Sequence, residues 1–190
     1  DYCGAAHAIA VNSATSALHI ACLALGVTAG DIVWTTPNTF VASANCARYC
    51  GATVDFVDID PETFNMCADA LAAKLAATDK LPTVVIPVHF SGHSCDMAAI
   101  AALAEQYDFK VIEDASHAVG GRYRDQPVGD CTYSDISVFS FHPVKIITSA
   151  EGGVALTNDA GLQRKMDRLR SHGVTRNPDD LTNLDEGPWH

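Results

Sequence analysis

The sequence reads Val111-Ile112-Glu113-Asp114-Ala115-Ser116-His117 at a point where a predicted helix gives way to a predicted strand. The alanine-rich segment before it, 97–106, has the composition of a helix. The run that follows is short, apolar and closed by polar residues, which is typical of a buried strand. A helix followed directly by such a strand is the repeating unit of a parallel sheet, so this stretch predicts an α/β fold.

Outward from this stretch, helical segments and short apolar runs alternate along the chain. We expect helices at 15–25, 39–49, 68–76, 97–106 and 160–171. We expect strands at 32–35, 53–58, 83–88, 110–113, 135–140 and 153–157, mostly apolar on both faces. The pattern predicts three layers, α/β/α, with helices on both faces of a mostly parallel sheet. Such sheets bind ligands beyond the carboxyl ends of their strands.

Composition limits the classes of partner. No apolar run reaches the ~18 residues that span a bilayer, and 23 acidic against 12 basic residues give a net charge of −11. This charge repels nucleic-acid phosphates and anionic lipid, so we expect neither nucleic acid nor a membrane as a partner. Seven cysteines without a repeated CxxC spacing indicate reduced thiols. With no visible secretory signal, we expect a cytoplasmic protein.

The two carboxylates of the opening stretch fall at the sheet edge where ligands bind. Asp114 is the better candidate for a site, because a carboxylate there could hold a heterocyclic nitrogen in its protonated form. The alternative is that Glu113 and Asp114 cap a following helix. The residues by themselves leave both interpretations open.

A second polar group, Asn12-Ser13-Ala14-Thr15-Ser16, precedes an alanine- and leucine-rich helix. Hydroxyls and free N–H groups at a helix N-terminus favour a bound phosphate. Ordinary N-capping explains the same residues. Neither a GxGxxG nor a GxxxxGK[ST] motif occurs, which argues against the dinucleotide and P-loop classes of binding site.

Lys145 follows a predicted strand among Phe139, Phe141, Val144 and Ile146. A lysine desolvated by such neighbours loses part of its proton affinity and becomes an amine nucleophile capable of Schiff-base chemistry. The alternative is a lysine at a strand end that extends its charge into solvent. An amine, a carboxylate at the sheet edge and a hydroxyl-rich helix start together are what a pyridoxal phosphate site requires.

Two further groups allow more than one interpretation. Phe40 opens a predicted helix, where its ring could stack on a flat ligand or pack in the core. The segment from His89 through His93 to Asp96 could hold a metal, but its Ser-Gly pair indicates a loop, with Asp96 capping the next helix. We therefore expect no metal site.

Three motifs, in their order and spacing, carry a resemblance to a known family. They are Ser13-Ala14-Thr15-Ser16-Ala17-Leu18, Glu113-Asp114-Ala115-Ser116-His117-Ala118, and Ser140-Phe141-His142-Pro143-Val144-Lys145 continuing to Glu151-Gly152-Gly153. From about residue 10 onward the chain resembles the sugar aminotransferases of the DegT/DnrJ/EryC1/StrS family, fold-type I enzymes that use pyridoxal phosphate. The ending Glu186-Gly187-Pro188-Trp189 looks most like the branch that makes amino-dideoxy-altrosamine nucleotides for pseudaminic acid.

The resemblance implies roles for individual residues. Lys145 resembles the lysine that binds the cofactor covalently and carries a proton, and Asp114 the partner of the pyridine nitrogen. His117 falls near the position of the cofactor's phenolic oxygen, and Phe40 where an aromatic ring stacks on the pyridine. A final group, Thr15, Ser16 and Ser140, would hold the phosphate.

The resemblance also implies an organisation and a reaction. Residues 1–175 would be the pyridoxal phosphate-binding large domain, N-terminally incomplete, and residues 176–190 a tail leading to an absent C-terminal small domain. We expect a homodimer that transfers an amino group, from glutamate, to a nucleotide-linked keto-sugar. A non-catalytic relative, an inactive fragment and a sugar dehydratase are the alternatives, although dehydratases of this type have histidine in place of Lys145.

Overall fold

A computed structural model of the chain describes residues 2–175 and 177. Its main sheet has the strand order β1-β9-β8-β5-β4-β2-β3. The strands are β1 (His7–Val11), β2 (Ile32–Thr35), β3 (Thr53–Phe56), β4 (Val84–Ile86), β5 (Lys110–Asp114), β8 (Ile136–Ser140) and β9 (Gly153–Thr157), and a separate small hairpin is formed by β6 (Arg122–Tyr123) and β7 (Gln126–Pro127). Strand β9 runs antiparallel to both of its neighbours, and the other neighbouring strands pair in parallel.

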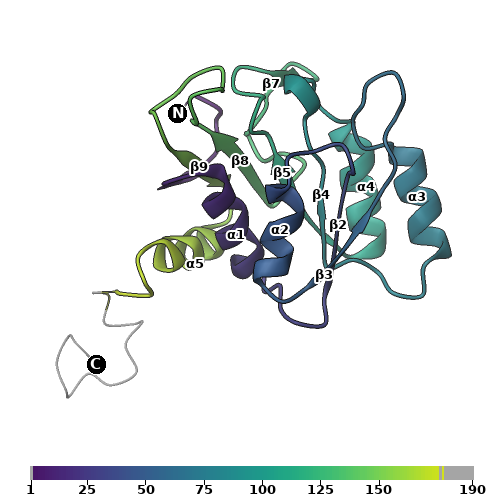
Figure 1. Ribbon diagram of the computed structural model, residues 1–190, viewed down its shortest axis with the longest axis horizontal. Coiled ribbons are helices and arrows are strands. Elements are labelled where there is room, and N and C mark those ends of the chain that lie inside the picture. The colour runs from purple at the N-terminus through teal and green to yellow at the C-terminus, as the bar shows by residue number, and fades with distance from the viewer. Residues whose placement is uncertain (1, 176, 178–190) are drawn as a thin grey trace.

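Helices cover both faces of the sheet (Figure 1). They are α1 (Ala14–Ala24), α2 (Ala42–Tyr49), α3 (Ala68–Ala77), α4 (Met97–Tyr107) and α5 (Ala160–Arg170), with the single turn η1 (Phe90–Gly92) between β4 and α4. Helix α1 contacts α2, α5, β8 and β9, whereas α3 contacts α4 and α4 contacts β5. The expected three-layer α/β/α fold with a mostly parallel sheet is therefore confirmed.

Alternating side chains of the central strands build a separate core on each face of the sheet. In β5, Ile112 packs in the core beneath α1 and α2, and its neighbour Val111 packs in the core beneath α3 and α4. This alternation follows from the pleat, which turns successive side chains to opposite faces. By the same rule Asp114 faces α1 and α2, and Glu113 faces the other side.

Side-chain caps fix where three helices begin. The hydroxyl of Ser13 accepts from the Ser16 N–H at the start of α1, the Asp96 carboxylate accepts from Ala99 N at the start of α4, and Asp159 accepts from two N–H groups at the start of α5. Each cap satisfies donors that a helix leaves open in its first turn. The predicted capping roles of Ser13 and Asp96 are confirmed.

The structure differs from the expected elements in several places, among them the hairpin of β6 and β7. Strand β1 was not expected, although its sequence is apolar after His7; only Ile9 of its five residues is buried. Strand β3 lies at a sheet edge and is mostly exposed, so it does not have two apolar faces. Helix α2 begins at Ala42 rather than at residue 39, which leaves Phe40 ahead of the helix.

Two further properties concern the chain as a whole. Within residues 2–175 and 177 no helix combines the length and the apolar character that crossing a bilayer requires. The expected tail, 176–190, lies outside the described residues except for Asn177.

Candidate active site

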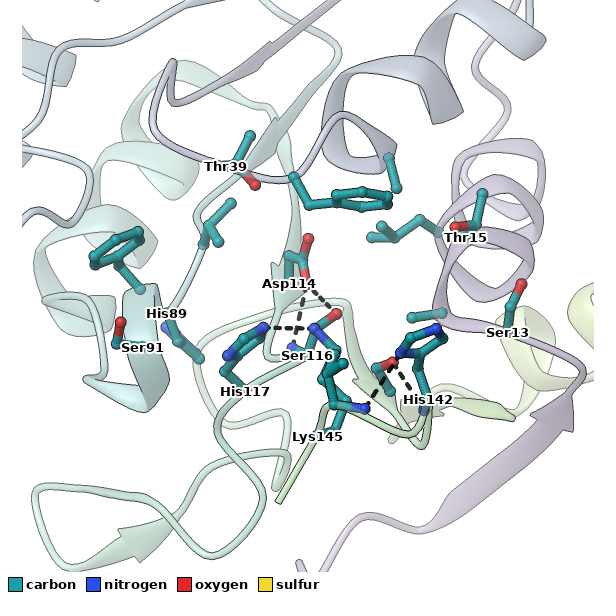
Figure 2. A pocket seen from close by; sticks show the side chains of 18 of the residues that line it. Ser13, Thr15, Thr39, His89, Ser91, Asp114, Ser116, His117, His142 and Lys145 are labelled. Atoms are coloured by element: carbon teal, nitrogen blue, oxygen red, sulfur yellow. Dashed lines mark hydrogen bonds between the residues drawn. The ribbon is translucent and has the colours of Figure 1, made fainter. Parts of the chain in front are cut away.

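A pocket of about 520 Å³ opens where several strands end on one side of the sheet (Figure 2). Its lining comes from the start of α1, the segment after β2, the segment after β4, the end of β5 and the turn after β8, and includes Thr15, Phe40, His89, Asp114, His117, Ser140 and Lys145. The carboxyl ends of β2, β4, β5 and β8 meet here, as expected for a ligand site in a mostly parallel sheet. The volume lies within the range of small-molecule sites.

Asp114 is the buried acid of this pocket, with 5% of its surface exposed. Its Oδ2 accepts from the Ser43 hydroxyl of α2 at 2.6 Å, and its Oδ1 accepts from the Ser116 hydroxyl at 2.6 Å and the Ser116 N–H at 3.2 Å. These hydrogen bonds fix the direction of the carboxylate. Turns rather than a helix follow β5, so the interpretation of Asp114 as a helix cap is wrong.

Lys145 projects into the same pocket and meets His117 (Figure 2). The atoms Nζ of Lys145 and Nε2 of His117 lie 2.5 Å apart. Burial lowers the pKa of Lys145 from its usual value, and the negative charge of Asp114 opposes part of that change. The pKa of His117 is also lowered, first by burial and then by the charge of Lys145. Both side chains are thereby biased toward their neutral forms.

The source of this desolvation differs in part from the expected one. Val144 and Ile146 are 74% and 65% exposed, so these two sequence neighbours remain largely in water. Phe139 is buried in a separate cluster with Val128 and Leu156. The predicted direction of the pKa change at Lys145 is confirmed.

The start of α1 lies against the strand that follows the lysine turn. Gly153 is so close to this helix start that a Cβ there would lie 2.4 Å from the carbonyl carbon of Ser13. Ser13 and Thr15 line the pocket, and the Ser16 hydroxyl instead donates to Asn12 Oδ1 at 2.6 Å. Capping therefore coexists with hydroxyls that face the pocket.

The remaining expected ligands, Ser140 and Phe40, also line the pocket. Ser140 is buried at the end of β8, and its Oγ accepts from the N–H of His142 at 3.4 Å. Phe40 is 73% exposed, so its interpretation as a core residue is wrong. Its ring is available to a ligand or to another chain.

The segment with two histidines forms no metal centre with its own residues. His89 is buried, its Nδ1 accepts from the Cys95 N–H at 3.1 Å, and its Nε2 lies 2.8 Å from Glu113 Oε2. Across residues 2–175 and 177, no three histidine, cysteine, aspartate or glutamate side chains cluster in a way that could hold a metal ion. The seven cysteines are free thiols.

Several residues in the pocket lining or in contact with it were not expected from the sequence. Ser43, which orients Asp114 across 71 positions of the chain, could have been noticed as a hydroxyl on an alanine-rich helix, but nothing local links it to Asp114. Ser43 is not part of the pocket lining, whereas Thr39, His142 and Glu151 line the pocket.

The sequence also matches a known protein family. The family model described as the DegT/DnrJ/EryC1/StrS aminotransferase family matches residues 1–185. The chain belongs to this family. The expected resemblance is thereby confirmed over nearly the whole sequence.

Similar members of the DegT/DnrJ/EryC1/StrS family are larger than this chain. It is 46% identical over 177 residues to GDP-perosamine synthase of Caulobacter vibrioides, covering 93% of this chain and 46% of that protein. It is 44% identical over 176 residues to UDP-4-amino-4,6-dideoxy-N-acetyl-beta-L-altrosamine transaminase of Campylobacter jejuni, again covering 93% of this chain and 46% of the relative. The chain therefore spans about half the length of the curated relatives that it matches.

One similar solved structure is of a form that contains the cofactor. The putative sugar aminotransferase Spr1654 of Streptococcus pneumoniae, in its PLP-form, superimposes with a TM-score of 0.82 at 31% identity, covering 93% of this chain and 49% of that one. Pyridoxal phosphate is the cofactor of DegT/DnrJ/EryC1/StrS aminotransferases. The pocket here fits that group, since it offers a partly desolvated amine, a fixed carboxylate and hydroxyls at a helix start.

Proposed function

We propose that this chain is the cofactor-binding part of an aminotransferase that transfers an amino group, from glutamate, to the keto group of a nucleotide-linked sugar. The observation that carries the proposal is the convergence of Lys145 and Asp114, which come from separate strand ends, on one pocket. Relatives with the printed names GDP-perosamine synthase and altrosamine transaminase support a sugar substrate.

Pyridoxal phosphate would be held by residues from the start of α1, the segment before α2 and the ends of β5 and β8. Thr15 and Ser140 would hold the phosphate at the start of α1, where N–H donors, that of Ser16 among them, and the helix dipole favour an anion. Phe40 would pack against the ring and Asp114 would keep the ring nitrogen protonated. When bound, the cofactor supplies a carbonyl that takes up the amino group and a ring that delocalises negative charge.

Lys145 would act first as the amine that binds the cofactor and then as the base that moves a proton. Both tasks require the neutral amine, and the lowered pKa of Lys145 increases the fraction in that form. His117 is placed to take part, because its Nε2 can accept a hydrogen bond from Nζ while Lys145 is charged. The oriented Asp114 limits how far the pKa of Lys145 falls.

We further propose that two copies of the protein assemble around this pocket. Phe40 and Val144 line the pocket and are 73% and 74% exposed, and Ile146 and Ile147, next to Val144 in the chain, are also exposed. Clustered apolar side chains of this size are typical of a surface that another chain covers. Residues 1–175 would then form the large domain of each subunit.

Reduction with borohydride tests the assignment of the lysine. The protein, in the longest form that its gene encodes, is incubated with pyridoxal phosphate, reduced, digested and mapped by mass spectrometry. We expect the pyridoxyl group on Lys145 and no stable adduct at this position in Lys145→Arg, because a guanidinium does not supply a neutral amine. Labelling at a different lysine would contradict the assignment.

Addition of glutamate separates transfer from binding alone. In a transaminase, glutamate converts the bound cofactor and shifts its visible absorption. An absorption spectrum that is unchanged by glutamate, in protein that carries the cofactor on Lys145, would favour a binding protein over an enzyme.

A further inference from the structure

The connection from β3 to α3, which carries none of the three motifs, lies behind one wall of the pocket. The wall is formed by Val88, His89, Phe90 and Ser91, between β4 and α4. Behind it lies Asn65, on the connection from β3 to α3, with only 3% of its surface exposed. Asn65 does not line the pocket.

The carboxamide of Asn65 makes three hydrogen bonds to the backbone of this wall segment. Its Oδ1 accepts from the Phe90 N–H at 2.9 Å, and its Nδ2 donates to the carbonyls of His93 at 3.0 Å and Ser94 at 3.1 Å. One N–H and two carbonyls around a single amide permit only one orientation of that group. The side chain thus joins both ends of the turn that carries Ser91.

The connection that presents Asn65 is itself fixed. The backbone carbonyl of Asn65 accepts from the Asp60 N–H at 2.9 Å. Next to this bond, Ile59 and Met66 pair as an antiparallel bridge. Phe64, beside Asn65, has a φ of 61° and its ring lies 6.0 Å from that of Phe90. A non-glycine residue in this conformation needs surrounding contacts to hold it.

The opposite side of the wall presses against the backbone of the proposed site. Gly92 has a φ of 87°, and a Cβ there would lie 2.6 Å from the carbonyl oxygen of His117. The His117 ring in turn contacts Lys145 Nζ. The segment 90–94 therefore lies between Asn65, which binds its backbone, and His117, which Gly92 approaches closely.

We propose that Asn65 is a positioning residue of the pocket: it holds the 90–94 segment against His117 and so sets the environment of Lys145. In its effect on the cofactor this inference rests on the proposed function. Loss of the two Nδ2 donors would leave the carbonyls of His93 and Ser94 without these partners, and the segment would move away from His117.

The test compares Asn65→Asp with Asn158→Asp in the longest form of the protein that the gene encodes. Asn158 is a matched control, because its amide also accepts from one backbone N–H, of Ala6, and donates to two carbonyls, of Asp130 and Cys131, away from the pocket. Three quantities are measured for each variant: hydrogen exchange of residues 88–95, the Kd for pyridoxal phosphate, and the pH midpoint of the visible absorption of the loaded protein.

For Asn65→Asp we expect faster exchange in 88–95, a Kd raised by about tenfold and a shifted pH midpoint, since small displacements of site groups have effects of this size. Asn158→Asp should leave all three unchanged. If Asn65→Asp does not fold, Gly92→Ala should produce the same shift in the pH midpoint with Asn65 intact, because it displaces the segment from the other side.

Two results would overturn the inference. One is an Asn65→Asp protein with unchanged Kd and pH midpoint; the other is equal exchange of 88–95 in the two asparagine variants. If the unaltered protein takes up no pyridoxal phosphate, the proposed function fails, and the exchange comparison still decides whether Asn65 holds the wall.

Discussion

Single residues acquire their roles here from the face of the strand on which they lie. Glu113 and Asp114 are adjacent carboxylates, yet Glu113 binds His89 and Ser134 on one side of the sheet, whereas Asp114 points into the pocket on the other. The chemistry of the two side chains is the same. The pleat of β5 decides which of them can meet a ligand.

Replacing Asp114 tests this difference at the residue scale. In Asp114→Asn the negative charge that raises the pKa of Lys145 is gone, so that pKa falls further. We expect an amine-reactive reagent to modify Lys145 with a pH midpoint lower than in the unaltered, cofactor-free protein. Turnover should fall by roughly a hundredfold or more, as when one preorganised polar group is removed from a site.

Glu113→Gln is the matched control for this variant, because it removes the neighbouring charge from the same strand. The pH midpoint at Lys145 should not change. A midpoint that rises in Asp114→Asn, or moves equally in both variants, would contradict the assignment of the electrostatic role to Asp114.

Local sequence was enough to name Lys145 and Asp114 as candidates, because each lies at or after the end of a short apolar run, and the structure places both in one pocket. The contacts that orient them are not local. Ser43 reaches Asp114 across 71 positions, and Asn65 reaches Phe90 across 25. No local periodicity in the sequence connects such pairs.

Contacts between helices and strands determine how the pocket is assembled. The contact of β9 with the start of α1 is a close one. Gly153 opens β9 directly against Ser13 and Ala14. Among the expected elements, the buried strands and the amphipathic helices were close to the observed ones. The two-residue strands β6 and β7 are too short to produce a pattern, and the edge strand β1 was missed although its sequence is apolar after His7.

A methyl group at position 153 tests the contact between these elements. In Gly153→Ala the new Cβ would overlap the backbone of Ser13, and backbone cannot yield as a flexible side chain does. We expect a loss of about 1–3 kcal/mol in the free energy of unfolding, measured with urea, because overpacking in tight sites costs this much. The affinity for pyridoxal phosphate should fall as well, since in the proposed site the start of α1 would supply the phosphate donors.

Gly161→Ala provides the comparison. In this variant the added methyl group approaches mainly the side chain of Asp159 at the start of α5, away from the pocket. It should change the affinity for the cofactor little. Equal affinities in the two alanine variants would show that the contact of Gly153 with α1 does not shape the site.

At the scale of the whole molecule, the proposed dimer rests on the exposed apolar side chains of Phe40 and Val144, which line the pocket, and of Ile146 and Ile147, which follow shortly after Val144 in the chain. The variant Ile146→Asp with Ile147→Asp places charges directly after Lys145, which lines the pocket, at two side chains that are more than half exposed. We expect sedimentation equilibrium to show a weaker dimer, because desolvating two carboxylates opposes association. Leu81→Asp, at an exposed apolar residue after α3, should not change the association.

Two results of the sedimentation experiment would contradict the proposed dimer. A protein that is monomeric before any substitution, or a dimer that tolerates both charges, would refute assembly through the pocket mouth. The overall architecture could be predicted from the alternation of elements, but the surface that meets a partner could not, because exposure of Phe40 and Val144 depends on how distant segments fold together.

Strand β1 pairs with β9, and the register joins residues about 140 positions or more apart, such as Val11 with Gly153. During synthesis on the ribosome β1 therefore cannot pair until β9 has been made and has left the ribosome. Long-range pairings of this kind slow folding. The start of α1 cannot settle against Gly153 before that moment. We expect the newly made chain to acquire the capacity to bind its cofactor only at the last step of folding, and to depend most on chaperones just before it.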